Sequence, residues 1–146
     1  LMPDQNVLVI DDEKHLCDLF TEILSRDGHR VQTAGTGNDG LTQLGDYGAG
    51  FSLVFLDMML PDSSGTDILR EIKRRNPALP VVMMTGFASK ESAVEAMRLG
   101  AYDYLAKPFN ISDVSLIASR ALERTRLIDE NRYLREELRE RYNFDN

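Results

Sequence analysis

Five polar side chains in this sequence follow short apolar runs in a pattern that could assemble a binding site for ions. The runs are residues 7–10, 53–56, 81–84 and 104–106, and the polar residues that follow them are Asp11, Asp12, Asp57, Thr85 and Lys107. Apolar runs bounded by polar residues are typical of strands buried on both faces. The carboxyl ends of parallel strands share one edge of a sheet, and open α/β sheets bind ligands there. The sequence therefore predicts a site for a divalent cation and an anionic group, built around Asp57.

The three carboxylates of this predicted site favour Mg²⁺ and phosphoryl chemistry. Carboxylates held close together disfavour one another's ionisation, and a divalent cation relieves that repulsion. Mg²⁺ takes one or two carboxylates together with waters and phosphoryl oxygens. We expect Asp12, Asp57 and the backbone carbonyl of Met59 to bind the ion directly. We expect Asp11 to act through a water. Asp57 is also the candidate nucleophile, because carboxylates can form acyl-phosphates.

Thr85 and Lys107 supply the groups that would hold the phosphoryl oxygens. A hydroxyl group and an ammonium suit that task, because both donate hydrogen bonds to anionic oxygens. Each residue has a simpler interpretation when it is taken alone. Asp11 or Asp12 could cap a helix, as Thr85 could after its strand, and Lys107 could be solvated surface. Their joint occurrence at the ends of predicted strands favours a common site.

The elements that position these residues alternate regularly along the chain. We predict strands at residues 6–10, 29–34, 51–56, 80–84 and 101–105. We predict helices at residues 14–27, 37–46, 65–75 and 88–98, and from residue 112 onward. Strands that alternate with helices in this way form βαβ units with right-handed crossovers around a parallel sheet. A chain of 146 residues is long enough for one such domain with a core of its own.

The end of the chain has a different character. Residues 112–142 contain no Pro or Gly, which predicts one helix of about 30 residues and about 45 Å. Such a helix is too long to pack on a small sheet, so we expect its second half to project. Leu127, Asn131, Leu134 and Leu138 follow the 4-3-4 spacing of a coiled-coil seam, and a buried Asn favours a two-stranded, in-register pair. We therefore predict a homodimer through this helix; the alternative is a solvated helix or a flexible linker.

Composition excludes several other classes of protein. No apolar stretch approaches the roughly 20 residues that span a membrane, and no secretion leader opens the chain. The single cysteine, Cys17, fits a reducing compartment and a packing role. Residues 1–118 carry 17 acids and 10 bases, which disfavours binding to nucleic acid, whereas residues 119–146 carry 7 of each. We expect a cytoplasmic, bacterial protein that contacts neither nucleic acid nor membrane directly.

The residue set resembles the receiver domain of two-component response regulators. The matching residues are Asp11–Asp12, Asp57, Met59–Asp62 with Gly65, Thr85–Gly86 and Lys107–Phe109. The resemblance covers residues 5 to about 122. It implies a flavodoxin-like (βα)₅ fold, which is a doubly wound parallel sheet with strand order 2-1-3-4-5. It also implies Mg²⁺-dependent phosphorylation of Asp57 by a sensor histidine kinase or a small phosphodonor. Tyr104 matches the switch aromatic of that family, which turns inward when Thr85 moves toward the phosphoryl group; the alternative is ordinary packing.

Residues 100–109 and the tail from 129 to 146 are similar to the NtrC/DctD class of sigma-54-dependent activators. In that class such a tail leads into an AAA+ ATPase domain and then a DNA-binding helix-turn-helix. This sequence contains neither, and it has no P-loop motif. We therefore expect a regulatory fragment, with a receiver domain at residues 1–122 and a helical linker at 123–146 that leads to the ATPase. Phosphorylation could release a restraint on the ATPase or add a positive contact, and the sequence leaves both open.

As a receiver, the chain is expected to catalyse only its own phosphoryl transfer and slow dephosphorylation, and not to be an enzyme for other substrates. One alternative is a receiver of another response-regulator class with a different output. A second is a phosphatase with an Asp nucleophile, although such enzymes carry it after strand one and Asp57 would end strand three. A third is a receiver-like interaction module, against which the full set of Asp12, Asp57, Thr85 and Lys107 argues.

Two apolar residues near the predicted site bear on the lifetime of a phosphoryl group. Met59 and Phe87 lie two residues beyond Asp57 and Thr85 respectively. Receivers that dephosphorylate quickly tend to carry polar side chains there, able to orient a water. Apolar side chains should exclude water, so we predict slow self-hydrolysis.

Overall fold

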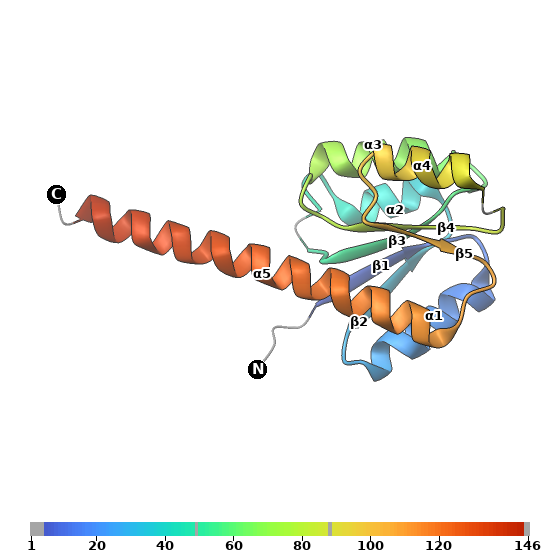
Figure 1. Ribbon diagram of the computed structural model, residues 1–146, viewed down its shortest axis with the longest axis horizontal. Helices are drawn as coiled ribbons and strands as arrows, with labels where there is room; N and C mark the ends of the chain where they lie inside the picture. Colours follow the sequence, from blue (N-terminus) through green and yellow to red (C-terminus); the bar gives the residue numbers. More distant parts are fainter. Residues whose placement is uncertain (1–4, 49, 88, 145–146) are drawn as a thin grey trace.

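The fold is a five-stranded parallel sheet covered by helices on both faces (Figure 1). A computed structural model describes residues 5–48, 50–87 and 89–144. The sheet order is β2-β1-β3-β4-β5. The strands are β1 (Asn6–Ile10), β2 (Arg30–Ala34), β3 (Leu53–Asp57), β4 (Val81–Thr85) and β5 (Asp103–Ala106). This order confirms the predicted doubly wound, flavodoxin-like fold and makes β3 the central strand.

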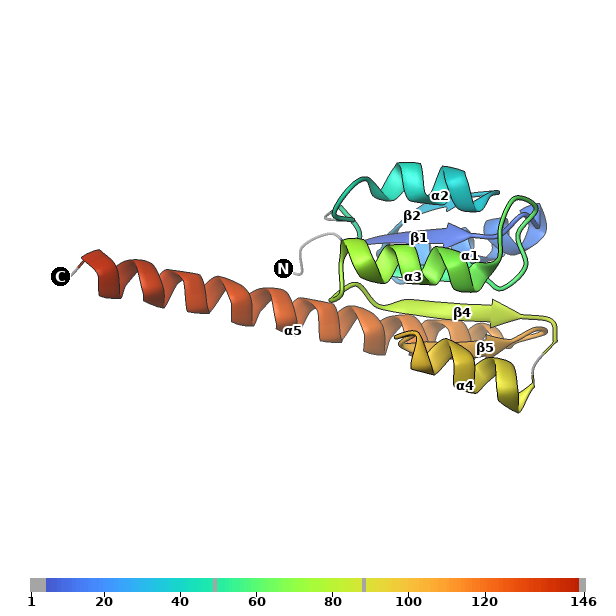
Figure 2. The same cartoon turned by 90° about the horizontal axis from the view of Figure 1, so that it is seen from above.

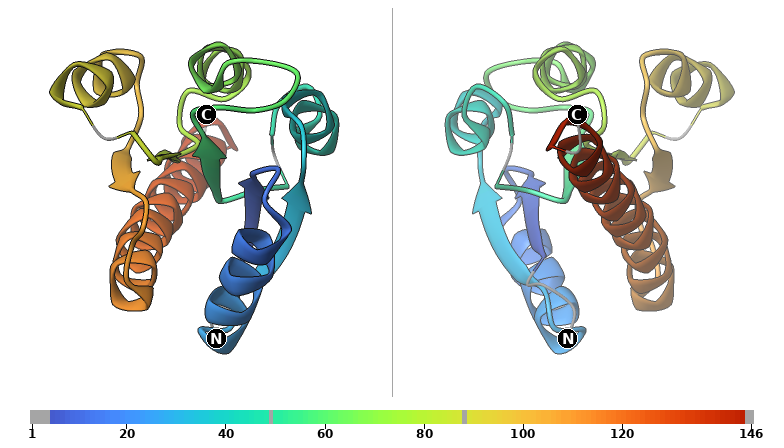
Figure 3. Two further views of the ribbon diagram at one scale, coloured as in Figure 1. Left: turned by 90° about the vertical axis from the view of Figure 1, so that its right-hand side faces the viewer. Right: turned by 90° about the vertical axis from the view of Figure 1, so that its left-hand side faces the viewer.

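The helices form one layer on each face of the sheet (Figures 1 and 2). One layer contains α1 (Lys14–Arg26) and the first part of α5 (Ile111–Phe144). The other contains α2 (Gly37–Leu44), α3 (Gly65–Arg75) and α4 (Lys90–Arg98). Figure 3 shows the two layers end-on, with α4 and α5 flanking the edge strand β5.

Each face of the sheet has its own hydrophobic core. Val7 and Val9 of β1 pack in a cluster with residues of α1 and α5, whereas Leu8 and Ile10 pack in a cluster with residues of the opposite layer. Alternate residues of a strand point to opposite faces, so a strand covered on both sides reads as a continuous apolar run. Phe20 lies edge-on to Phe55, with ring centroids 4.9 Å apart. Full burial of such a side chain stabilises the fold by roughly 1.5–3 kcal/mol.

Most predicted boundaries shift by one or two residues. The predicted strand at 51–56 is Leu53–Asp57, and the predicted strand at 101–105 is Asp103–Ala106. The predicted helices at 37–46 and 88–98 are Gly37–Leu44 and Lys90–Arg98. The apolar residue Ala101 is buried, but its N–H bonds to the carbonyl of Ala96 and so ends α4 rather than starting a strand. Residue 88 lies outside the described residues.

The last helix leaves the domain, as its length predicts. Its 34 residues correspond to about 50 Å at roughly 1.5 Å per residue. Thr125 is the last buried residue of α5 up to residue 142, and its hydroxyl donates to the carbonyl of Ser52, which directly precedes β3 (2.9 Å). Beyond it the helix projects past the amino ends of the strands (Figure 1). The predicted division after residue 122 stays a prediction. Within the described residues, no helix is long and apolar enough to cross a membrane.

Candidate functional site

The predicted site residues gather at the carboxyl edge of the sheet, which faces the viewer in the left panel of Figure 3. Asp57 and Thr85 are the last residues of β3 and β4. Asp11 directly follows β1, and Lys107 directly follows β5. Because neighbouring parallel strands end at the same level, the strand order alone brings these residues together.

Three carboxylates meet in this crevice. Oxygen atoms of Asp11, Asp12 and Asp57 all lie within 4.8 Å of one another. Asp11 is 1% exposed and Asp57 is 7% exposed, whereas Asp12 is open to solvent. Three hard oxygen donors of this kind suit Mg²⁺, which retains waters and takes few protein ligands. The exposure of Asp12 leaves one side of the crevice open to solvent.

The ammonium of Lys107 sits between the two buried carboxylates. Its Nζ lies 2.9 Å from Oδ2 of Asp11 and 3.3 Å from Oδ2 of Asp57. Burial lowers the pKa of Lys107, but the hydrogen bond and charge of Asp11, together with those of Asp57, outweigh it, so the pKa is raised overall. Lys107 therefore stays charged at neutral pH and faces the oxygens where a phosphoryl group would be attached.

The carboxyl group of Asp57 is harder to ionise than an ordinary Asp side chain. Burial raises its pKa, and the nearby charge of Asp11 raises it further. The N–H of Met59, which donates to Oδ1 of Asp57 (3.2 Å), and the ammonium of Lys107 lower the pKa without cancelling the rise. A cation would favour the ionised form of Asp57, because three carboxylates share the single ammonium of Lys107 and the cation adds positive charge.

The loop after β3 is folded tightly against Asp57. The N–H of Gly65 donates to the carbonyl of Met58 (2.8 Å), and Met59 and Ser64 pair in antiparallel fashion. A Cβ atom on Gly65 would overlap the carbonyl oxygen of Asp57 and lie 2.6 Å from Cα of Met58. Only glycine fits this close approach, which explains its presence at the start of α3.

Thr85, the last residue of β4, forms hydrogen bonds to the loop that follows it and to the residue that follows β5. It is buried, and its Oγ1 accepts a hydrogen bond from the N–H of Phe87 (3.1 Å). Its carbonyl accepts from the N–H of Lys107 (2.6 Å). A movement of Thr85 would therefore displace the loop after β4 and the end of β5.

The simpler capping interpretations fail for these residues. The residue at the N-cap of α1 is Glu13, and its side chain makes no capping hydrogen bond. The carboxylate of Asp11 accepts a hydrogen bond from the N–H of Glu13 (2.9 Å) and also binds the ammonium of Lys107. Helix α4 is capped by Ser89, not by Thr85. Cys17 is buried in the core beside α5, as expected.

Tyr104 of β5 is half-buried. Its side chain packs against the core on the face of the sheet that α2, α3 and α4 cover. Its hydroxyl is 2.8 Å from Oγ of Ser92. Ser92 also forms the capping box of α4 with Ser89. Sequence reasoning identified Tyr104 but missed Ser92. The Ser89-x-x-Ser92 spacing signals a helix start, but nothing local points to Tyr104.

The predicted seam of α5 is exposed. The side chains of Leu127, Asn131, Leu134 and Leu138 are all exposed to solvent, and Leu134 is 50% exposed. By helix periodicity these four residues point about 150° away from the buried face of α5. That buried face contains Val114, Ala118, Ala121, Leu122 and Thr125. The stripe is therefore free of contacts with its own domain.

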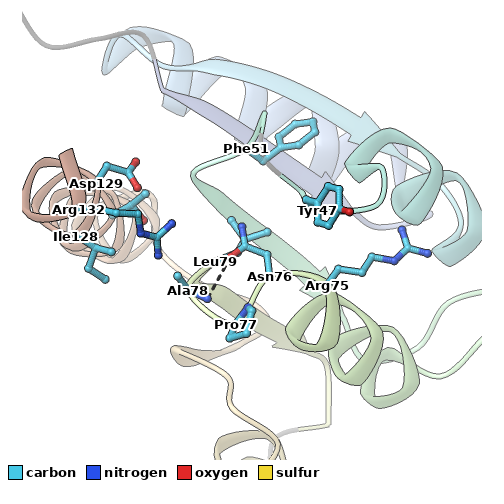
Figure 4. Close-up of a pocket in the computed structure, with 11 residues that line it drawn as sticks. Tyr47, Phe51, Arg75, Asn76, Pro77, Ala78, Leu79, Ile128, Asp129 and Arg132 are labelled. Atoms are coloured by element: carbon cyan, nitrogen blue, oxygen red, sulfur yellow. Dashed lines mark hydrogen bonds between the residues drawn. The ribbon is translucent and has the colours of Figure 1, made fainter. Parts of the chain in front are cut away.

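A cavity of about 470 Å³ lies beside the amino ends of β3 and β4 (Figure 4), at the edge of the sheet opposite the acidic crevice. It is lined by the loops before β3 and β4, including Tyr47 and Asn76, and by Asp129 and Arg132 of α5. The strands separate it from Asp57, so none of the predicted site residues lines it.

Comparison with known proteins gives a consistent result. The sequence model described as "Response regulator receiver domain" matches residues 7–118. The transcriptional regulatory protein ZraR of Escherichia coli (strain K12) is 37% identical over 124 residues, which are 85% of this chain and 28% of ZraR. This chain thus spans less than a third of that relative.

Two solved structures support the same assignment. A crystal structure of NtrX from Brucella abortus in complex with ADP is 42% identical, with a TM-score of 0.80, over 91% of this chain and 29% of that one. A CheY-like response regulator receiver domain protein from Methanospirillum hungatei JF-1 is 30% identical, with a TM-score of 0.79, over 85% of this chain and 98% of that one.

Proposed function

The chain belongs to the response regulator receiver domain family, and on that premise we propose that Asp57 accepts a phosphoryl group from a sensor histidine kinase or a small phosphodonor. The observation that carries this proposal is the buried carboxylate of Asp57 at the end of the central strand, with Asp11, Asp12 and Lys107 converging on it. In the reaction, an oxygen of Asp57 forms a bond to phosphorus as the bond between phosphorus and the donor atom breaks. The product is an acyl-phosphate.

The acidic crevice fits Mg²⁺, which would neutralise the carboxylates and the phosphoryl oxygens. We propose Asp12, Asp57 and the carbonyl of Met59 as ligands, with Asp11 acting through a water. Lys107 already faces the oxygen of Asp57, so it can bind a phosphoryl oxygen without a large movement. Thr85 supplies a hydroxyl hydrogen bond to another phosphoryl oxygen. These residues serve transfer to and from Asp57, and we do not expect turnover of other substrates.

Phosphorylation would act by shifting a conformational equilibrium. A ligand shifts such an equilibrium only through its different affinity for the two states. Here the phosphoryl oxygens would draw Thr85 and Lys107 inward, and Tyr104 would follow. The short contact of Tyr104 with Ser92 supports this proposal, because it connects β5 to the first turn of α4. The surface formed by α4, β5 and α5 would then change.

We propose that α5 pairs with a second copy of the chain to form a parallel coiled coil. Glutamates flank one side of the seam at residues 123, 130 and 137, and Arg135 flanks the other. In a parallel, in-register pair Glu130 would face Arg135 of the second copy, whereas an antiparallel pair would align glutamates with one another. Glu130 already pairs with Arg126 of its own helix (3.0 Å), but an exposed pair of this kind is worth little and exchanges readily.

The output of the protein is a further proposal. Similarity to ZraR and NtrX, together with the tail that resembles sigma-54-dependent activators, supports control of an AAA+ ATPase domain in a longer protein. A receiver with a different output remains the alternative. The cytoplasmic location and the lack of direct contact with nucleic acid or membrane stay predictions.

The solution mass of the protein tests this proposal. We would measure it by light scattering with and without Mg²⁺ and beryllofluoride, a mimic of the phosphoryl group, at matched protein concentrations. A dimer that loosens or repacks with the mimic supports a restraint released at Asp57. A monomer that pairs only with the mimic supports activation through the receiver face. If neither the molar mass nor the hydrodynamic radius changes when the mimic is added, the proposal is contradicted.

Slow dephosphorylation is a separate prediction. Met59 is 68% exposed and Phe87 is 78% exposed, and their backbone N–H groups donate to Asp57 and Thr85 respectively, so two exposed apolar side chains follow the site residues directly. They offer no polar atom to orient an attacking water. We expect the double variant Met59→Asn, Phe87→Glu to lose its phosphoryl group about tenfold faster than the wild type. This is less than the roughly 100-fold or more that a positioned general base contributes, because the new side chains would only help to orient the water. Equal first-order rates of phosphate loss would refute this explanation.

A further inference from the structure

Asp62 lies at the tip of the loop that follows Asp57, yet its carboxylate bonds to a different element. Oδ1 accepts from the N–H of Gly37 (2.8 Å) and Oδ2 accepts from the N–H of Asn38 (2.9 Å). These are the first two amides of α2, which have no partner within the helix. The Thr36 hydroxyl accepts from the third amide, that of Asp39 (3.0 Å). The first three amides of α2 therefore donate to Thr36, which directly precedes the helix, and to Asp62, which lies in the loop between β3 and α3.

The contact between this loop and α2 is close. A Cβ atom on Gly37 would overlap Oγ of Ser63 and lie 2.7 Å from Cδ1 of Ile68. Because residue 37 is glycine, the side chains of Ser63 in the loop and Ile68 in α3 can pack directly on the first turn of α2. The two amide bonds also lower the pKa of Asp62, because they stabilise its ionised carboxylate.

Helix α2 provides a fixed support for that contact. At its other end Nη1 of Arg75 donates to the carbonyls of Leu41 (2.9 Å) and Gly45 (3.0 Å). In its middle, Gly40 packs so closely on β1 that a Cβ atom there would lie 2.5 Å from Cδ1 of Ile10. Ile10 directly precedes Asp11. Helix α2 is thus fixed relative to the strand that supplies the other two carboxylates of the crevice.

The loop itself connects the tip to the site. The loop begins directly after Asp57, and its two ends are joined by the hydrogen bond between Gly65 and Met58. Met59 is held near this junction by its bond to Asp57 and its pairing with Ser64, and Asp62 lies three residues further along. Fixing the tip against α2 therefore fixes the base relative to Asp11 and Asp12. We infer that Asp62 is a positioning residue for the metal site: by binding the first turn of α2 it holds the loop so that Asp57 and the Met59 carbonyl face the carboxylates that follow β1.

This inference rests on the proposed function, because it assumes Mg²⁺ binding at the acidic crevice. Groups that orient metal ligands without touching the ion typically contribute about 10- to 100-fold in affinity. We expect Asp62→Ala to weaken Mg²⁺ binding about tenfold. Asp62→Asn keeps one carbonyl acceptor for an amide of α2, so its affinity should lie between those of the wild type and Asp62→Ala.

Isothermal titration with Mg²⁺ alone, without any phosphodonor, provides the test. Thr36→Ala is the matched control, because it removes a hydrogen bond from the same helix start without touching the loop. Weaker Mg²⁺ binding in both Asp62 variants, with wild-type affinity in Thr36→Ala, supports the inference. Equal affinity in the wild type and Asp62→Asn overturns it even if Asp62→Ala fails to fold. Equal weakening in Thr36→Ala also overturns it. Absence of Mg²⁺ binding by the wild type would instead refute the proposed metal site, and this inference with it.

Discussion

We expect the Asp57→Asn variant to lose phosphorylation by a small phosphodonor, with incorporation falling by at least about 100-fold. The amide of Asn is not a nucleophile toward phosphorus under these conditions. The neighbouring Asp11 cannot easily replace it, because its oxygens already bind Lys107 and the N–H of Glu13. Intact-protein mass spectrometry after incubation with Mg²⁺ and acetyl phosphate would measure the added phosphoryl group.

The matched control is Asp129→Asn, which removes an exposed carboxylate of α5 far from the crevice. It should be phosphorylated like the wild type. The phosphoryl group on the wild type should also be released by hydroxylamine, as expected for an acyl-phosphate. Phosphorylation that persists in Asp57→Asn, or that is lost equally in Asp129→Asn, would be incompatible with Asp57 as the acceptor.

The same Asp57→Asn variant should be more stable than the wild type when Mg²⁺ is absent. The pKa of Asp57 is raised in the folded protein, so folding favours its protonated form. Its contribution to stability is therefore present below its ordinary pKa of 3.8 and is lost as the pH rises through the raised value. Asn carries no charge, so the thermal midpoint of the variant should not fall through this window. Added Mg²⁺ should raise the midpoint of the wild type more than that of the variant.

A second large effect is expected at the seam of α5. In the proposed coiled coil Leu134 occupies a core position, and Leu134→Lys would bury an ammonium from each chain next to its twin. We expect the dissociation constant of the dimer to rise by at least about 100-fold, which corresponds to roughly 2.7 kcal/mol. Sedimentation equilibrium over a range of protein concentrations would measure it.

Tyr133→Lys is the control for this change. Tyr133 is a neighbouring large side chain on the same helix, 66% exposed, and it points away from the seam. That variant should pair like the wild type. If Leu134→Lys pairs as tightly as the wild type, the seam does not hold the dimer. If the wild type is monomeric, with and without beryllofluoride, the coiled coil is wrong for this chain.

Much of the fold was predictable because burial on both faces of the sheet leaves a direct trace in the sequence. The residues of β1, β3 and β4 are apolar almost throughout, and each run ends at the edge where the site forms. The positions of Asp57, Thr85 and Lys107 follow from that pattern and the strand order. Exact boundaries did not follow, because apolar residues such as Phe51 and Ala101 also pack on the core from the loops.

The contacts of Asp62 and Ser92 were not predictable by the same reasoning. Asp62 bonds to residues 24 and 25 positions away, and Ser92 contacts Tyr104 across 12 positions. The first contact depends on how a loop meets α2 and the second on how α4 meets β5, and periodicity encodes neither. Asp62 was part of the residue set that suggested the family, but its partner could be identified only from the folded chain.

Phosphorylation of Asp57 is expected to change the surface formed by α4 and β5. Hydrogen–deuterium exchange of peptides covering α4 and β5, measured with Mg²⁺ with and without beryllofluoride, would detect this change, with Asp57→Asn as the comparison. We expect altered amide protection around Ser92 and Tyr104 when beryllofluoride is added to the wild type, and none in the variant. Exchange that stays the same in the wild type, or changes equally in both proteins, would contradict it.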